Sequence, residues 1–259
     1  MASSQPRLVT LRYSVAHAKA DWTLREEPVP ESRAHYLTAT LVREILEAWA
    51  RRSGRSMQVG ANLAVRWVEE RPAIGVDPDV YVVEPPPPEG DQVTSLRLWQ
   101  PGHAPPLLAV EVVSANHPHK DYLEAPDKYA ASGTNELWIF DAELAGPHVH
   151  GGPHRLQVWC REATGAFSRL YAGPGPVRSD AVGGWLFAVD EGRRLRIADD
   201  EQGSGWWMTE AEAERHAKDR EHEATERERE AKEQEREAKE AALARVAELE
   251  AELARRDRG

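Results

Sequence analysis

The chain has 259 residues, of which 41% are hydrophobic and 30% charged, proportions that suit one sizeable globular domain with a more polar appendage. Its formal net charge of −11 has the wrong sign for a protein that grips nucleic acid by its overall field, so a phosphate-bearing substrate would need a local basic patch or bound cations. A single cysteine excludes an internal disulfide, and no apolar run resembles a membrane span or a signal peptide, so we expect a soluble, cytoplasmic protein without membrane contact.

The first predicted element is an amphipathic helix over residues 35–52, because Leu37, Leu41, Ile45 and Trp49 recur four residues apart. Strands are predicted next, where short runs rich in β-branched and aromatic residues lie between turn residues. These runs cover residues 62–68, 80–84, 107–113 and 137–141. The proline-rich segment that begins at residue 84 predicts a loop near a functional edge of the sheet.

A second helix is predicted between the last two of these strands. Pro126 suits the first turn of that helix, and Gly133 suits its C-terminal cap. Strand, helix and strand then form a βαβ unit with parallel strands. Four further runs, between Gly and Pro turns, predict a meander that completes or extends the sheet. The fold class is therefore α/β, with a mixed central sheet flanked by helices.

The C-terminal part has a different composition, from which Pro is absent and in which Ala, Glu, Arg and Lys dominate. A direct seven-residue repeat over 228–241, with Glu and Lys four residues apart, predicts a long charged helix. Near its end, Ala242, Val246, Leu249 and Leu253 step by 4, 3 and 4 and predict a short pairing segment and a homodimer. A lone charged helix without a partner is the alternative. We thus expect a domain over 1–205 and a charged helix over 206–259.

One carboxylate stands in an unexpected place. The run "PPLLAVEVVS" (105–114) is typical of a buried strand, yet Glu111 lies in its middle. A carboxylate taken out of water is destabilising by several kcal/mol unless a cation meets it. Two interpretations are open from this run alone: Glu111 faces solvent or pairs with a buried arginine, or it binds a metal ion.

Asp79 offers a partner for the metal interpretation. It precedes the strand predicted at 80–84, so the two carboxylates can meet at one end of the sheet if the strands are adjacent. Mg²⁺ often uses only one or two protein carboxylates beside phosphate oxygens of the substrate. A bound ion would also supply the positive charge that the acidic surface lacks.

Three segments in this order carry a resemblance to a known family: "GVDPDVYVV", "LLAVEVVS" and "HKDYLEAPDKYAASGTNELWIFD". Together they resemble the Uma-two family of restriction-endonuclease-like proteins, within the PD-(D/E)XK nuclease superfamily, over about residues 30–190. The resemblance implies a restriction-endonuclease-like fold and metal-dependent hydrolysis of DNA phosphodiester bonds. It further implies that Asp79 and Glu111 hold one Mg²⁺ or Mn²⁺, with the backbone carbonyl of Val112 completing the protein ligands.

The resemblance also requires a lysine that orients the attacking water or stabilises the transition state. The two positions where such proteins carry it are occupied here by Val113 and Ala125. Lys128, one helical turn beyond residue 125, is predicted to replace it, and Lys120 is the second candidate.

Two more residues are candidate auxiliaries. His35 begins the first helix and either faces the site or is a surface residue, whereas Asp121 caps the following helix or orients a lysine. The absent lysines leave a second function open, a catalytically inactive nuclease fold that binds partners through its C-terminal helix. Hydrolysis of another phosphate substrate is a third. Intact Asp79 and Glu111 favour the enzyme.

Overall fold

The computed structural model describes residues 32–115, 118–148 and 152–256, with side chains described up to residue 245 except Leu243. The chain divides into two compact units, Met1–Thr209 and Glu210–Gly259. Among the described residues, no helix combines the length and the hydrophobicity that crossing a bilayer requires.

The first unit is built around a six-stranded sheet with the strand order β1-β4-β6-β7-β8-β9. Its strands are β1 (Gln58–Gly60), β4 (Val80–Val83), β6 (Leu108–Val112), β7 (Glu136–Phe140), β8 (Leu156–Arg161) and β9 (Phe167–Gly173). Strands β6 and β7 are parallel, and every other neighbouring pair is antiparallel. The predicted α/β class with a mixed central sheet is therefore confirmed.

The βαβ unit has the predicted form with one addition. The helix α2 (Ala125–Ser132) connects β6 to β7, carries Pro126 in its first turn and ends at Gly133. Gly133 has a φ of 83°, a left-handed conformation that glycine adopts without the strain a side chain brings. Directly before α2, the turn η2 (Lys120–Glu124) is π-helical, a feature that no sequence pattern indicated.

Two small sheets correct details of the sequence interpretation. The proline-rich excursion contains the short helix η1 (Gly90–Gln92) and the strand β5 (Ser95–Arg97). Strand β5 pairs in parallel with β2 (Ala64–Arg66), which also pairs with β3 (Gly75–Val76). The last strands, β10 (Val177–Arg178), β11 (Trp185–Val189) and β12 (Arg194–Ala198), form a sheet of their own, so only β8 and β9 extend the central one.

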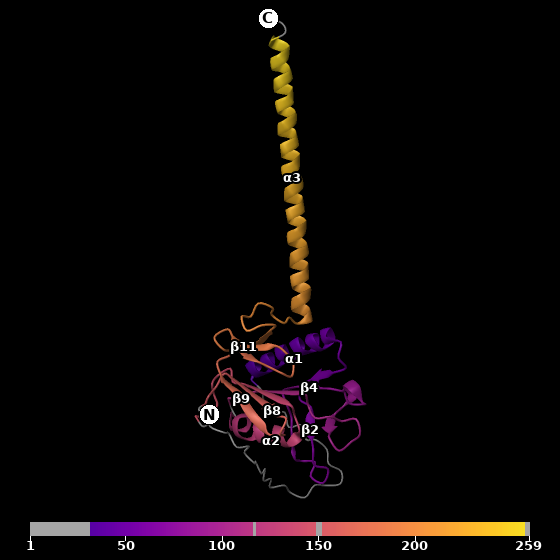
Figure 1. Ribbon diagram of the computed structural model, residues 1–259, viewed down its shortest axis with the longest axis vertical. Coiled ribbons are helices and arrows are strands. Elements are labelled where there is room, and N and C mark those ends of the chain that lie inside the picture. The colour runs from indigo at the N-terminus through magenta and orange to yellow at the C-terminus, as the bar shows by residue number, and fades with distance from the viewer. Residues whose placement is uncertain (1–31, 116–117, 149–151, 257–259) are drawn as a thin grey trace. The chain divides into compact units, whose positions relative to one another are not determined.

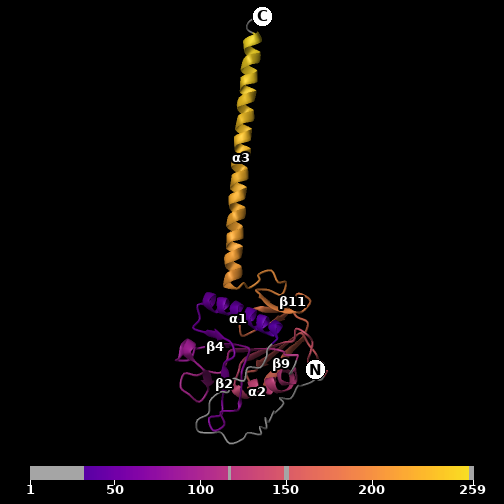
Figure 2. The same ribbon diagram turned by 180° about the vertical axis from the view of Figure 1, so that it is seen from behind.

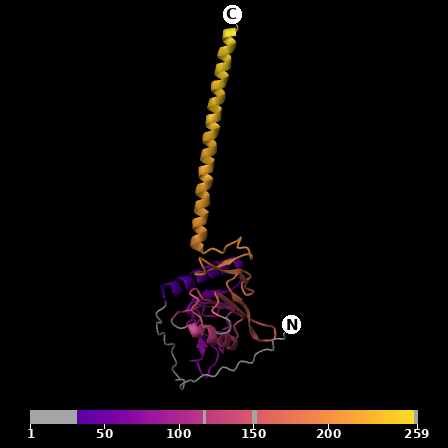
Figure 3. The same cartoon turned by 90° about the vertical axis from the view of Figure 1, so that its left-hand side faces the viewer.

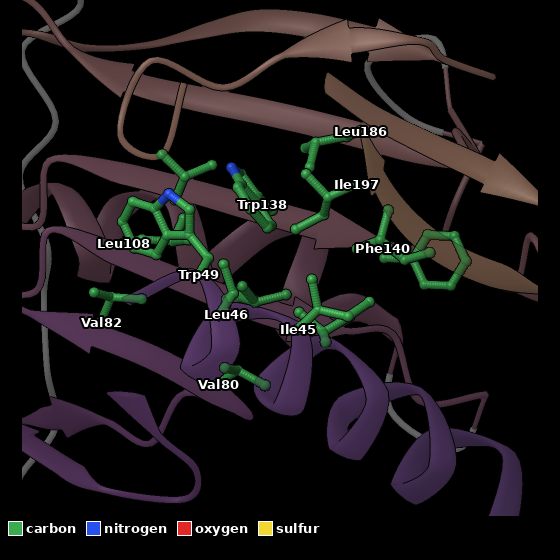
Figure 4. Packing of buried hydrophobic residues seen from close by; sticks show 14 of the residues in the cluster. Ile45, Leu46, Trp49, Val80, Val82, Leu108, Trp138, Phe140, Leu186 and Ile197 are labelled. Atoms are coloured by element: carbon green, nitrogen blue, oxygen red, sulfur yellow. The ribbon is translucent and has the colours of Figure 1, made fainter. Parts of the chain in front are cut away.

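Alternating side chains of the central sheet bury two separate apolar cores. The helix α1 (Arg33–Ser53) and the sheet β10–β12 cover one face, where Ile45 and Leu46 pack with Val80, Leu108 and Trp138 (Figure 4). The helix α2 and the sheet β3-β2-β5 cover the other face. Figure 1 shows α1 and β11 above the central sheet and α2 and β2 below it, and Figures 2 and 3 show the same layers from behind and from the side. Each fully buried Leu or Ile contributes about 2 kcal/mol.

The second unit is the helix α3 (Glu210–Arg256), 47 residues long and uninterrupted (Figure 1). Its described side chains are almost all exposed, and ion pairs such as Glu214–Lys218 and Glu228–Lys232 join residues four apart. Each such pair stabilises a helix by only about 0.2–0.5 kcal/mol, but together they support a solvated charged helix. The long helix is thus confirmed, while the side chains of Val246, Leu249 and Leu253 lie outside the described ones.

Candidate active site

The two strands that carry the acidic residues are neighbours. Strand β4 runs antiparallel to β6, with Val80 opposite Val110, so the start of β4 lies beside the end of β6. Asp79 stands immediately before β4, and its Oδ2 accepts a hydrogen bond of 2.7 Å from the backbone N–H of Val112. The topology therefore brings Asp79 to the end of the strand that holds Glu111.

His35 faces this site. Its ring Nε2 lies 3.1 Å from Asp79 Oδ2, and the side chain is 8% exposed. The start of α1 positions the ring, because the hydroxyl of Ser32 caps the helix by accepting a hydrogen bond from the backbone N–H of His35. Of the two interpretations of His35, the structure favours the one in which it belongs to the site. Asp79 Oδ1 accepts no hydrogen bond from the described residues.

Glu111 is buried, with a residue exposure of 1%, and points to the face of the sheet that α2 covers. Its Oε1 accepts a hydrogen bond of 2.6 Å from the hydroxyl of Tyr129 on α2. The nearest described cation to Oε2 is the Lys120 ammonium group at 4.0 Å, beyond hydrogen-bonding distance. Burial, followed by the charge of Asp79, raises the pKa of Glu111 well above its usual range. The Lys120 charge lowers this pKa but does not offset the burial and the charge of Asp79.

Lys120 and Asp121 come from the π-helical turn η2. Asp121 is buried, its carboxylate accepts a hydrogen bond from the backbone N–H of Ser114, and its Oδ1 lies 3.9 Å from Lys120 Nζ. Burial raises the pKa of Asp121 to about 6. The negative charge of Glu111 raises the pKa of Lys120. Lys120, the second candidate lysine, and Asp121, a candidate auxiliary, therefore both lie beside Glu111.

Lys128, the lysine chosen from the sequence, lies elsewhere. Its ammonium group is 2.8 Å from Glu124 Oε2, four residues earlier, and the side chain is 24% exposed. Lys128 does stand one turn beyond residue 125 in α2, as the sequence argument required, but its ammonium group pairs with Glu124 and not with the acids of the site. The side chains of Val113 and Ala125, at the two positions without lysine, are buried in the second apolar core.

Two other buried carboxylates show what a structural acid looks like in this fold. Glu136, 2% exposed, accepts hydrogen bonds from Trp138 Nε1, the Ser179 hydroxyl and the backbone N–H groups of residues 180 and 181. Asp141 accepts three, from the hydroxyl of Tyr122 and the N–H groups of residues 145 and 146. Neutral donors therefore satisfy both acids, and Glu111 with its single hydroxyl donor differs from them.

The oxygen atoms at the site fit a small divalent cation. Among the described residues, no three His, Cys, Asp or Glu side chains form a group that could hold a metal ion unaided. Asp79 Oδ1 and Glu111 Oε2 each lack a hydrogen-bond donor there, and the Val112 carbonyl stands at the same strand end. Carboxylate and carbonyl oxygens are ligands of Mg²⁺, which completes its shell with water and phosphate oxygens.

Sequence reasoning assigned no role to Tyr129. It belongs to the segments that carry the family resemblance, and it is fully buried. A buried tyrosine hydroxyl nearly always needs a partner, so a tyrosine on the inner side of α2 was a usable signal. The sequence could not indicate that Glu111 would be the partner, since 18 residues separate the two.

The protein is thus an α/β domain with a mixed central sheet, in which Asp79 and Glu111 lie at one end of two adjacent strands. A sequence model of the Uma2 family, described as "Putative restriction endonuclease", matches residues 21–169. That match covers more than half of the chain, and the protein belongs to this family.

A similar solved structure is the "putative nuclease belonging to DUF820 from Anabaena variabilis ATCC 29413". The two chains are 12% identical, with a TM-score of 0.40 over 60% of this chain and 76% of that one. The comparison with curated proteins gives no match.

Proposed function

We propose that this protein is a metal-dependent endonuclease that hydrolyses DNA phosphodiester bonds, with Mg²⁺ or Mn²⁺ as its ion. Asp79, Glu111 and the carbonyl of Val112 hold the ion in this proposal. Membership of a family described as restriction endonucleases supports the reaction class. A single cysteine supports a reducing, cytoplasmic location.

One observation carries the proposal: Glu111 is a buried carboxylate that the protein itself does not satisfy. It has one hydroxyl donor and a cation at 4.0 Å, whereas Glu136 on the neighbouring strand has five hydrogen-bond donors, the Cys160 thiol among them. An uncompensated buried acid is destabilising, so its presence beside Asp79 indicates a bound cation in the working protein.

The side chains of the chain have separate tasks in this mechanism. His35 and the N–H of Val112 fix Asp79 through Oδ2, so Oδ1 would be the oxygen available to an ion. Tyr129 fixes Glu111 through Oε1 in the same way. When bound, the ion supplies a water of lowered pKa and neutralises charge on the phosphate.

The substrate approaches against the net charge of −11. DNA affinity in this proposal therefore depends on the bound ion and on local cations rather than on the overall field. We further propose that α3 pairs with a second copy through Leu249 and Leu253, which would give a homodimer with two active sites.

Plasmid nicking by the purified protein tests the proposal, in Mg²⁺, in Mn²⁺ and in chelator, beside a Glu111→Ala variant. We expect metal-dependent nicking that the variant lacks. Equal nicking by both proteins would place the activity at another site or in a contaminant. No nicking by either would favour the alternative, a catalytically inactive nuclease fold that associates with partners through α3.

A further inference from the structure

Large apolar side chains gather on the surface at the edge of the sheet that holds Asp79 and Glu111. Among the described residues, six large hydrophobic side chains are exposed. Four of the six lie on segments at this edge, namely Tyr36, Leu37, Leu123 and Leu144, and we call these four residues the apolar rim. Single exposed apolar side chains are ordinary on a protein surface, but four at the edge of one candidate site favour a binding surface.

The start of α1 supplies one half of the rim. His35 points inward, where its ring lies 3.1 Å from Asp79, whereas the next two residues, Tyr36 and Leu37, are 59% and 53% exposed. Leu37 is the first member of the apolar stripe that the sequence predicts for α1, and a later member, Ile45, is fully buried in the core. The stripe therefore begins with a leucine that the core does not cover, two residues from the histidine of the site.

The other half of the rim consists of Leu123 in η2 and Leu144 in the loop after β7. Strands β6 and β7 are parallel, so this loop leaves the sheet at the same edge as the end of β6. The two segments are tied together, because the hydroxyl of Tyr122 donates a 2.8 Å hydrogen bond to Asp141 Oδ2, which also accepts one from the N–H of Gly146. Tyr122 packs in the core on the sheet face opposite α1. The two halves of the rim thus flank the strand ends from opposite faces of the sheet.

The backbone of Leu144 adds an independent observation. Its φ is 52°, in the left-handed region where a residue other than Gly, Asn or Asp is uncommon and strained. The side chain is exposed, so its burial does not offset this strain. Glycine would occupy the same turn without strain. A strained and exposed leucine beside a candidate site favours a role in binding rather than in folding.

The charge of the chain indicates which form of DNA suits such a surface. Duplex DNA presents sugars and phosphates to a protein and keeps the faces of its bases stacked inside, and a chain with a net charge of −11 attracts such a surface poorly. An unpaired strand exposes the faces of its bases, which stack on aromatic side chains. Tyr36 is the aromatic member of the rim. Arg33, exposed on the same turn of α1, offers a positive charge to the phosphates of that strand.

We propose that the apolar rim binds the bases of an unpaired DNA strand, so that this protein acts on single-stranded or locally unpaired DNA in preference to intact duplex. The inference rests on the proposed function and names its substrate class. Bases on either side of the scissile phosphate pack against the two halves of the rim. The phosphate between them then faces the strand ends that carry Asp79 and Glu111.

Fluorescence anisotropy of labelled DNA in Ca²⁺ tests the rim by binding alone, with a single strand and its duplex of the same sequence as probes. We expect wild type to bind the single strand about tenfold more tightly than the duplex. Tyr36→Ala should weaken single-strand binding about tenfold and change duplex binding by less than about twofold, because one base loses its stacking partner. Leu170→Ala, which removes an exposed leucine from β9, is the matched control and should bind both probes like wild type.

A Leu144→Gly variant separates binding from folding. Glycine accepts the φ of 52° without strain, so this variant should melt no lower than wild type. The loss of the apolar side chain should weaken single-strand binding about fivefold. Thermal melts and the same anisotropy titration provide the two measurements.

Cutting in Mn²⁺ extends the test to activity. Wild type should nick a duplex with a central unpaired bubble about tenfold faster than the fully paired duplex, and Tyr36→Ala should lose most of this preference. Equal binding of single strand and duplex by wild type, or rim variants that bind like wild type, would overturn the inference and leave the nuclease reaction standing. Rim variants that change the sedimented mass but not DNA binding would also overturn it, in favour of a contact between copies. Single-strand binding through the rim without cutting in any metal would instead overturn the proposed function and support the binding surface.

Discussion

Buried carboxylates in this protein differ by what surrounds each of them. Glu136 and Asp141 are satisfied by hydroxyl, indole and backbone donors, and they join β7 to neighbouring segments. Glu111 lies one strand away with one hydroxyl donor. Since burial without donors is destabilising, the surroundings of each acid separate a structural role from a functional one.

Replacing each acid by its amide should reveal this difference. We expect Glu111→Gln to raise the free energy of unfolding of the metal-free protein at pH 7.5 by about 1–3 kcal/mol, because an uncompensated carboxyl is removed. Glu136→Gln should lower it by about 3 kcal/mol, because the amide NH₂ would face the N–H groups of residues 180 and 181. Urea unfolding in chelator measures both. Destabilisation of similar size in both variants would contradict the distinction.

The pH dependence of stability should carry the signature of Glu111. Its pKa is raised in the folded state, mainly by burial, so the folded protein holds a proton that the unfolded chain releases. Stability in chelator should therefore fall as pH rises from the ordinary glutamate pKa of about 4.5 toward the folded value, and then level off. Urea midpoints of wild type and Glu111→Gln between pH 5 and pH 8 measure this. The urea midpoint of the variant should decline less with pH than that of wild type. Parallel pH profiles of the two proteins would argue against a raised pKa of Glu111.

At the scale of elements, β4, β6 and the turn η2 assemble the site, and the sequence predicted two of the three. Asp79 and Glu111 could be paired in advance because each carboxylate flanks or interrupts a strongly apolar strand. Lys120 could not be chosen over Lys128, since the choice depends on an i→i+5 hydrogen bond between Ala125 and Lys120. Asp121 and Ala125 are both buried, and burial depends on tertiary packing, which local propensity does not report.

The helix α3 should govern association. We expect a Leu249→Glu, Leu253→Glu double variant of the full chain to sediment at half the mass of wild type, because two charges enter the pairing seam. A Thr225→Glu, Gln234→Glu double variant adds the same charge on the helix upstream of that seam and should keep the wild-type mass. Pairing through α3 would be refuted if the leucine variant, or a chain that ends at Thr209, sedimented with the same number of subunits as wild type.

At the scale of the whole molecule, the net negative charge opposes DNA binding, and a metal ion at the site would offset that charge locally. A net charge of −11 repels DNA, and the proposed ion at Asp79 and Glu111 would reverse the local sign at the proposed phosphate site. A net negative charge is compatible with membership of the Uma2 family, because a nuclease needs positive potential only where it binds and cuts DNA.

Metal binding should therefore stabilise the folded state. We expect Mn²⁺ at 100 times its dissociation constant to add about 2.7 kcal/mol to the free energy of unfolding, and the melting temperature to rise accordingly. Glu111→Gln should lose most of this rise, whereas Glu124→Gln, which removes an exposed acid of the turn η2, should keep it. Thermal melts with and without Mn²⁺ provide the measurement, and an equal rise in all three proteins would point to binding elsewhere.

The sequence by itself determined the α/β class, the parallel βαβ unit, the long charged helix and the pair Asp79 and Glu111. These follow from periodicity, from turn residues and from the position of Glu111 inside an apolar run, all of which are local features of the sequence. Only the tertiary structure decided that His35 binds Asp79, that Tyr129 binds Glu111 and that Lys120 rather than Lys128 reaches the site. Each of these contacts joins elements far apart in the chain or depends on a backbone register, and both are set by how the apolar faces pack.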